Sequence, residues 1–135
     1  MTADALLLQP AHAIAAAVRQ GDVSAEALAQ ASLARIERTN AAVNAFTDVT
    51  TARALATAQE LDRRVQAGDV DTLTLPLLGV PYAVKNLFDV QGLTTLAGSK
   101  IERGHPPATR DGPLLQRMDA AGAVLVGALN MDEYA

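Results

Sequence analysis

The sequence has no cysteine and few aromatic residues, and both shortages limit its chemistry. Without cysteine, disulfide bonds, thiolate nucleophiles and cysteine-based zinc sites are excluded. The four aromatic residues include no tryptophan, and the 11 Lys and Arg residues form no cluster along the chain. Because nucleic-acid binding requires clustered positive charge, and the net charge is −4, we do not expect this segment to bind nucleic acid.

Long hydrophobic runs are also missing. The longest strongly apolar run, residues 120–129, contains two glycines and has half of the roughly 20 residues that a membrane span requires. Asp4 precedes the apolar residues 6–8, and no basic residue stands ahead of them, so the N-terminus does not match a signal peptide. We therefore expect a soluble, cytoplasmic protein without membrane contacts.

Glycine and proline divide the chain into two regions. Residues 1–72 contain three of them, whereas residues 73–135 contain twelve. Together with the 28 alanines, this distribution predicts a helical region over 1–72 and an α/β region over 73–135. Residues 130–135 follow an apolar run without any terminating signal, which predicts that the α/β region is truncated and that the chain is a fragment.

Three helices are predicted in the first region. One covers residues 10–20, because proline suits a first helical turn and Gly21 suits a C-cap. Ser24 is expected to cap a second helix that extends to about residue 39. Apolar residues at helical spacing predict a third helix from residue 47 or 48 to residue 68.

The second region is predicted to contain two strands joined by a crossover helix. The strands are expected at residues 80–84 and 123–126, with the helix at 111–122 between them. A long irregular stretch, 86–109, separates the first strand from the helix. A strand, a crossover helix and a second strand form a βαβ unit with parallel strands.

Lys85 is the candidate catalytic residue, because it directly follows the apolar run 80–84. Ligands of open α/β sheets bind at the carboxyl ends of strands. A partly desolvated lysine there has its charged form disfavoured and can serve as a neutral base. Asn86 adds no negative charge that would retain the proton. The alternative is a lysine that extends into solvent from a strand end.

The other polar candidates have simpler interpretations. His12 and His105 have no partner at metal-ligand spacing, so we expect them at the surface or in a loop. Ser99 precedes Lys100 but lacks the Gly-x-Ser-x-Gly pattern of a nucleophile elbow, so we expect it in a turn. Four acidic residues without metal-loop spacing are expected as caps or ion-pair partners. These are Asp89, Asp111, Asp132 and Glu133.

Residues 79–99 carry a recognisable block, Gly-Val-Pro-Tyr-Ala-Val-Lys-Asn-Leu-Phe-Asp-Val-Gln-Gly-Leu-Thr-Thr-Leu-Ala-Gly-Ser. It resembles the catalytic-lysine segment of the amidase signature family. Residues 111–135 and, with weaker motifs, the helical N-terminus are similar to that family as well. The resemblance implies an α/β fold in which helices cover a mixed sheet. This chain would contain its N-terminal helices and its first βαβ unit.

The resemblance also implies a Ser–cis-Ser–Lys triad. Lys85 would accept a proton, through the cis-serine, from the nucleophilic serine, and an acyl-enzyme would form and then be hydrolysed. No cofactor or metal is implied. The two serines of the triad would lie beyond Ala135, so we expect the chain alone to lack amidase activity.

Within the family, residues 85–89 and 93–101 most resemble the biuret and carboxybiuret hydrolase branch of cyanuric acid breakdown. Its substrates are small, linear, urea-like amides. Most family members carry Asp where this chain has Asn86. Two alternatives remain open: the glutamine amidase subunit of a transfer-RNA amidotransferase, and a non-catalytic helical interaction module. The resemblance further implies a homo- or hetero-oligomer and a small helical partner subunit.

Overall fold

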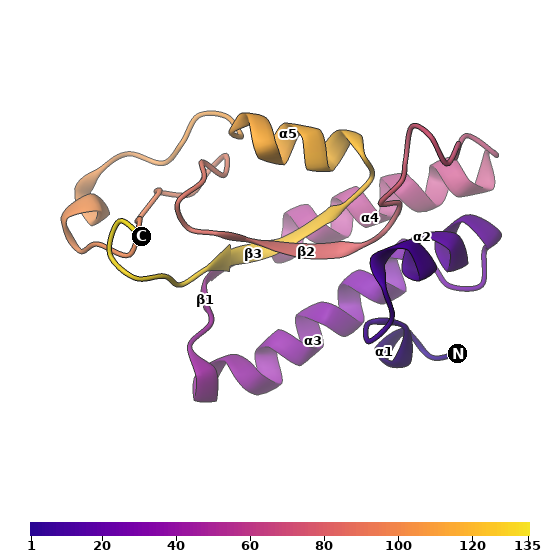
Figure 1. Cartoon of the computed structure of the whole chain (residues 1–135), viewed down its shortest axis with the longest axis horizontal. Helices are drawn as coiled ribbons and strands as arrows, with labels where there is room; N and C mark the ends of the chain where they lie inside the picture. The colour runs from indigo at the N-terminus through magenta and orange to yellow at the C-terminus, as the bar shows by residue number, and fades with distance from the viewer.

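The computed structural model describes all 135 residues, and it shows helices packed on a small sheet (Figure 1). No helix combines the length and the hydropathy that a membrane crossing requires. The elements, in chain order, are α1 (Ala3–Leu6), α2 (Ala11–Gln20), α3 (Ala25–Val43), β1 (Phe46–Val49), α4 (Thr51–Gln66), β2 (Pro81–Lys85), the 3-10 helix η1 (Ile101–Gly104), α5 (Pro113–Ala120) and β3 (Val124–Leu129).

The first two predicted helices are confirmed as α2 and α3. Gly21 ends α2 in the left-handed conformation, at a φ of 77°. The Ser24 hydroxyl caps α3 by accepting a hydrogen bond from the Ala27 amide at 3.0 Å. The helix α3 continues beyond the predicted end near residue 39, because the chain leaves the helical conformation only at Asn44, whose φ is 49°.

The prediction that the third helix begins at residue 47 or 48 is wrong. Residues 46–49 form β1, which pairs antiparallel with β3, and α4 begins at Thr51. The Thr50 hydroxyl, which could cap a helix locally, instead donates to the Leu125 carbonyl oxygen at 2.9 Å. Gly127 of β3 allows β1 to lie this close to β3, because a Cβ at position 127 would clash with the Asp48 carbonyl oxygen and the Phe46 ring. Tertiary pairing therefore overrides the local helical pattern.

The sheet has the strand order β1-β3-β2 and is mixed. The strands β2 and β3 are parallel, with Lys85 opposite Leu129, so the predicted βαβ unit is confirmed. Pro81, which cannot donate to a ladder, is the first residue of the edge strand β2. The strand β3 extends three residues beyond the predicted end, to Leu129.

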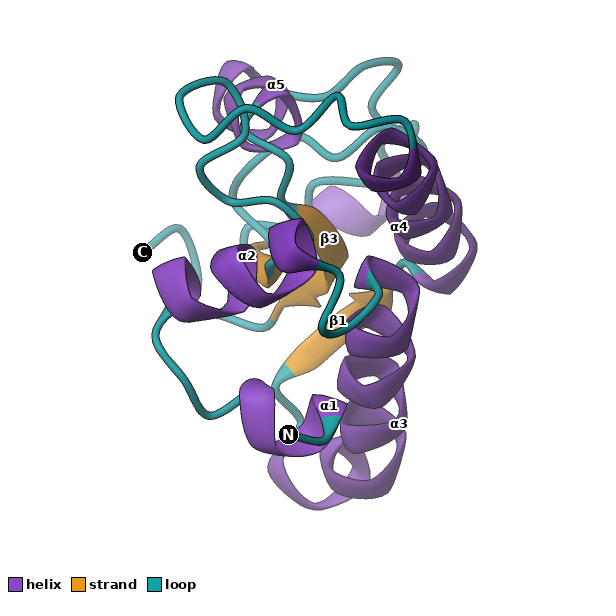
Figure 2. Ribbon diagram, turned by 90° about the vertical axis from the view of Figure 1, so that its right-hand side faces the viewer, coloured by secondary structure: helices purple, strands orange, loops and turns teal.

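Two hydrophobic clusters lie on opposite faces of the sheet. The larger one joins residues of α2, α3 and α4 to Val124 and Val126 of β3. The smaller one joins Leu115 of α5 to Val84 and Leu125. Since side chains alternate along a strand, residues 124 and 126 face one layer and residue 125 faces the other. Figures 1 and 2 show α5 on one side of the sheet and α3 on the other.

The predicted α/β class, a mixed sheet covered by helices, is thus what the structure has. The larger cluster contains residues of both predicted regions, 1–72 and 73–135. The division of the chain at residue 72 stays a prediction.

Candidate active site

Lys85 lies at the carboxyl edge of the parallel strand pair. The segments that follow β2 and β3 meet there, since parallel strands end at the same edge. The Tyr134 amide donates to the Ala97 carbonyl oxygen at 2.8 Å, which joins the segment after β3 to the segment after β2. Figure 1 shows the C-terminus beside the loops that follow β2.

The Lys85 side chain is 42% exposed, and its Nζ lies 3.8 Å from Asp132 Oδ1. The side chain is therefore partly buried within these 135 residues. Asp132 is thus an ion-pair partner, one of the two roles expected for it, although the sequence did not identify Lys85 as its partner because the two residues are far apart along the chain. The base role of Lys85 stays a prediction.

Asn86 is one of two buried polar residues, with 3% of its surface exposed. Its side-chain oxygen accepts from the Leu96 amide at 2.8 Å, and its Nδ2 donates to Thr47 Oγ1 at 2.8 Å. Its backbone donates to the Leu129 carbonyl oxygen at 2.9 Å and accepts from the Ala97 amide at 2.8 Å. Asn86 thereby connects the ends of β2 and β3, the strand β1 and the turn at residues 96–98.

The turn at residues 96–98 has an unusual backbone. Ala97 and Gly98 both have positive φ, 46° and 71°. A Cβ at Gly98 would lie 2.7 Å from the carbonyl oxygens of Met131 and Asp132, so only glycine allows this contact. Non-glycine residues adopt positive φ at an energetic cost, and such strain is often found at functional sites.

Ser99, the second buried polar residue, is occupied by structural contacts. Its hydroxyl donates to Glu133 Oε1 at 2.6 Å and accepts from the Ile101 amide at 3.3 Å. The predicted turn position is confirmed, and the serine joins the segments after β2 and β3 a second time.

A third link between these segments involves Glu102 of η1. The Tyr134 hydroxyl donates to Glu102 Oε1 at 2.6 Å, and His105 Nδ1 lies 2.6 Å from Glu102 Oε2. The hydrogen bond from Tyr134 is the main cause that lowers the pKa of Glu102, and the contact with His105 adds to it.

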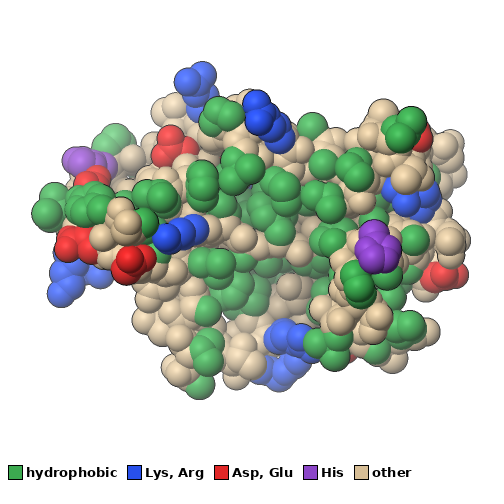
Figure 3. All heavy atoms as spheres, viewed as in Figure 1, with side chains coloured by type: hydrophobic (Ala, Val, Ile, Leu, Met, Phe, Trp, Pro, Cys, Tyr) green, Lys and Arg blue, Asp and Glu red, His purple; other side chains and the backbone are tan.

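The histidines are both exposed, as predicted. In Figure 3, histidine side chains appear on the left and on the right part of the face shown and do not adjoin one another. No three His, Asp or Glu side chains are grouped closely enough to hold a metal ion. Of the polar residues weighed in the sequence, the structure brings Asp132 to Lys85, and it joins Ser99 to Glu133 between the segments that follow β2 and β3.

An ion-pair network joins α4, which packs on one face of the sheet, to α5 and the segment before it on the other face. Arg53 of α4 contacts Asp111, just before α5, and Asp119 within α5. The hydrogen bond from Arg53 lowers the pKa of Asp111, whereas burial raises the pKa of Asp119. Tyr82 is packed nearby with no hydrogen-bond partner for its hydroxyl, and burial raises its pKa to about 12.

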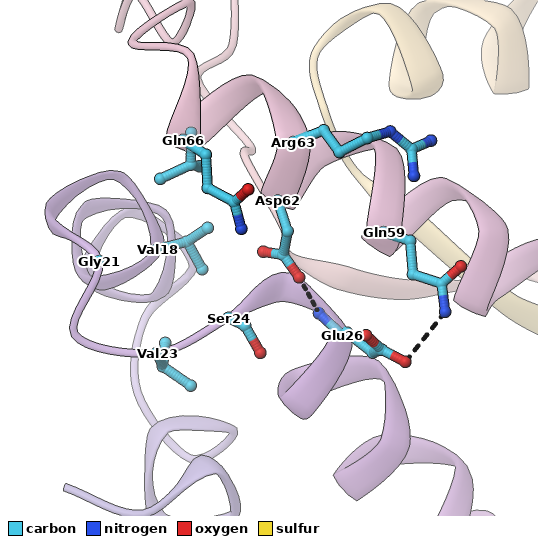
Figure 4. Close-up of a pocket in the computed structure, with 10 residues that line it drawn as sticks. Val18, Gly21, Val23, Ser24, Glu26, Gln59, Asp62, Arg63 and Gln66 are labelled. Carbon is cyan, nitrogen blue, oxygen red and sulfur yellow. Dashed lines mark hydrogen bonds between the residues drawn. The ribbon is translucent and has the colours of Figure 1, made fainter.

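A surface pocket between α2, α3 and α4 lies apart from Lys85 (Figure 4). Asp62 of α4 points at the start of α3, where it accepts from the amides of Ala25 at 2.7 Å and Glu26 at 3.0 Å. Gln59 donates to the Glu26 side chain at 3.0 Å. These polar groups are satisfied by one another, so the pocket is a helix junction.

The structure defines an α/β protein in which helices cover a mixed sheet, with Lys85 at the end of a parallel strand. Residues 27–135 match the model of the family described as Amidase. The chain belongs to the amidase signature family, as the resemblance of residues 79–99 predicts.

Known proteins extend this likeness. The chain is 52% identical over 118 residues to AtzE of Pseudomonas sp. (strain ADP), described as part of a 1-carboxybiuret hydrolase, and the match covers 87% of this chain and 25% of that protein. It is 45% identical to a glutamyl-tRNA(Gln) amidotransferase subunit of Geobacter sulfurreducens, over 84% of this chain and 22% of that protein. The chain thus spans about a quarter of the length of these relatives.

A solved structure shares the fold closely. It is described as an unexpected vestigial protein complex that reveals the evolutionary origins of an s-triazine catabolic enzyme. The TM-score is 0.89 at 50% sequence identity, and the match covers 94% of this chain and 27% of that one.

Sequence reasoning missed three features of the site: Thr47, the pairing of Asp132 with Lys85, and the structural role of Asn86. Asn86 carried a usable signal, since a polar amide directly after a buried strand must find partners. Thr47 and Asp132 carried none, because their contacts join segments that are distant along the chain.

Proposed function

We propose that this chain is the N-terminal part of an amidohydrolase that cleaves a carbon–nitrogen bond of a small, linear, urea-like amide of the biuret or carboxybiuret type. The observation that carries the proposal is Lys85 at the end of β2, within the family-like block 79–99. The 52% identity to part of a 1-carboxybiuret hydrolase supports the substrate class. The enzyme acts in the cytoplasm and needs no cofactor.

Lys85 is the base of a Ser–cis-Ser–Lys triad whose serines come from the rest of the enzyme. The neutral amine takes the proton of the cis-serine hydroxyl, which in turn takes the proton of the nucleophilic serine. That serine attacks the carbonyl carbon, the carbon–nitrogen bond breaks, and the leaving nitrogen gains a proton. Water then hydrolyses the acyl-enzyme. Asp132 Oδ1 lies 3.8 Å from Lys85 Nζ, and the proposal requires the amine to turn from Asp132 toward the cis-serine.

The test uses the complete enzyme, meaning the longer protein of which we propose this chain to be the N-terminal part. Lys85→Ala should abolish ammonia release from biuret and carboxybiuret, because it removes the proposed base. The thermal transition should move by only a few degrees, since the side chain is 42% exposed. Turnover by Lys85→Ala at a rate near that of the wild type would contradict the proposal.

A second candidate is the glutamine amidase subunit of a transfer-RNA amidotransferase. The 45% identity to a glutamyl-tRNA(Gln) amidotransferase subunit favours it. A substrate panel separates the two enzymes. Ammonia released from glutamine, but not from biuret or carboxybiuret, would identify the amidotransferase.

A small helical partner subunit is part of the proposal, in a homo- or hetero-oligomer. The description of the similar structure as a protein complex supports it. Co-purification of a tagged complete enzyme, followed by mass determination of the assembly, tests this expectation. A protein that binds such a subunit but turns over no amide would instead be a non-catalytic interaction module.

A further inference from the structure

We infer that Asn86 is a positioning residue for Lys85, acting through a matched hydrogen-bonded pair with Thr47. The inference rests on the proposed function, because it assigns Lys85 the role of the base. Asn86 itself does not react. Its amide group holds the end of β2, the turn at 96–98 and β1 in a fixed arrangement around Lys85.

The amide orientation of Asn86 follows from its neighbours. The Leu96 amide is a donor, so the group facing it must be the side-chain oxygen, 2.8 Å away. The nitrogen then faces Thr47 Oγ1, also at 2.8 Å. Because both ends are engaged and only 3% of the residue is exposed, the side chain has a single satisfied orientation.

Thr47 makes the complementary half of the pair. Its hydroxyl donates its one proton to the Ala128 carbonyl oxygen at 3.3 Å. Only a lone pair of Thr47 Oγ1 therefore faces position 86, and that position must hold a donor. An ionised Asp there has no donor, so Thr47 would have to turn its proton away from Ala128 and toward the carboxylate.

The pair supports the backbone around Lys85. Asn86 directly follows Lys85, and its own amide holds the Leu129 carbonyl oxygen opposite the strand end at 2.9 Å. Its side-chain oxygen and its backbone oxygen receive the amides of Leu96 and Ala97, the latter at a φ of 46°. Loss of this side chain releases the strained turn and lets the Lys85 strand end shift.

The experiment compares variants of the complete enzyme by kcat, KM and amide hydrogen exchange. Asn86→Ala should lower kcat by about 10- to 100-fold with KM within about threefold, because small misplacements of a catalytic group act mainly on the chemical step. Exchange in the peptide covering residues 94–99 should become faster. Asn86→Asp and Thr47→Val should give smaller losses of kcat, and Thr47→Ser should be more active than Thr47→Val.

Asp62→Ala is the matched control, because the Asp62 side chain also makes two hydrogen bonds, here from the amides of Ala25 and Glu26, but lies at the junction of α3 and α4. It should lower the thermal transition while leaving kcat and the exchange of residues 94–99 unchanged. Wild-type kcat in Asn86→Ala, or unchanged exchange in that peptide, overturns the inference. Turnover by Lys85→Ala overturns the proposed function instead, and the exchange measurement then decides by itself whether Asn86 holds the turn.

Discussion

Arg53 and Asp111 form a bidentate ion pair that joins α4 to the segment before α5. The two nitrogen–oxygen distances are 2.8 and 2.6 Å, and the exposed fractions of the two side chains are 24% and 13%. Asp111 Oδ1 also accepts from the Gln91 amide at 2.8 Å. The pair therefore fixes the loop after β2 as well as the helix, although its members are 58 residues apart.

Arg53→Ala should lower the free energy of unfolding by about 2 kcal/mol, because three charge-assisted hydrogen bonds, two to Asp111 and one to Asp119, are lost and the largely buried Asp111 carboxylate loses its partner. Urea unfolding of this chain measures the change. Arg53→Lys keeps the positive charge but cannot form a bidentate pair. Its free energy of unfolding should therefore lie between those of the wild type and Arg53→Ala. Equal stability of Arg53→Ala and the wild type would show that the pair contributes nothing.

Asp111 should make stability depend on acid pH. Its pKa is lowered in the folded chain, chiefly by the Arg53 hydrogen bond, whereas an unfolded Asp titrates near about 3.9. The folded state therefore binds fewer protons, and the stabilisation is complete above the unfolded pKa and is lost as pH falls through the folded one. The stability difference between wild type and Asp111→Asn should shrink as pH falls from about 6 toward about 2.

Urea titrations at several pH values measure this difference. The contribution of Asp119 to stability depends on pH in the opposite sense, because burial raises its pKa and the folded chain binds its proton more readily than the unfolded chain does. Asp119→Asn is therefore the informative companion variant. A stability difference for Asp111→Asn that stays constant over the acid range would contradict the assigned role.

Gly98→Ala should be more destabilising than Gly92→Ala. Both glycines have positive φ, so each substitution strains the backbone by about 1 kcal/mol. At Gly92 the added Cβ meets no atom within 4 Å, whereas at Gly98 it meets two carbonyl oxygens at 2.7 Å. The additional destabilisation of Gly98→Ala over Gly92→Ala comes from the contact between the turn at 96–98 and residues 131–132. Thermal unfolding of the two variants measures this difference. Equal destabilisation by the two substitutions would mean that residues 131–132 move away from the added Cβ without a loss of stability.

Asp62→Ala should lower the free energy of unfolding by about 1–2 kcal/mol, since the carboxylate caps two free amides at the start of α3. Asp69→Ala provides the comparison, because Asp69 pairs with Arg64 at 3.0 Å but is 72% exposed. An exposed pair of this kind contributes about 0–1 kcal/mol. Chemical denaturation should give Asp62→Ala a clearly lower free energy of unfolding than Asp69→Ala. A lower free energy of unfolding for Asp69→Ala would contradict the capping role of Asp62.

Much of the fold could be read from local patterns in the sequence. Ser24 and Gly21 mark helix ends through contacts within a few residues, and the apolar run before Lys85 marks a strand. Such signals depend on neighbours along the chain, so they act before any tertiary structure exists. The predicted helices, the parallel strand pair and the position of Lys85 at a strand end all rest on them.

Tertiary structure alone decided the features that join distant segments. Residues 46–49 became a strand because β3 offers a partner and Gly127 lets it approach, against the local helical pattern. Asp132 reached Lys85, and Asn86 found Thr47, only after the parallel strands brought their ends together. Local conformational propensities are small compared with the free energy gained by burying and pairing a whole strand. These contacts therefore form only in the folded chain, and the residues next to them in the sequence do not indicate them.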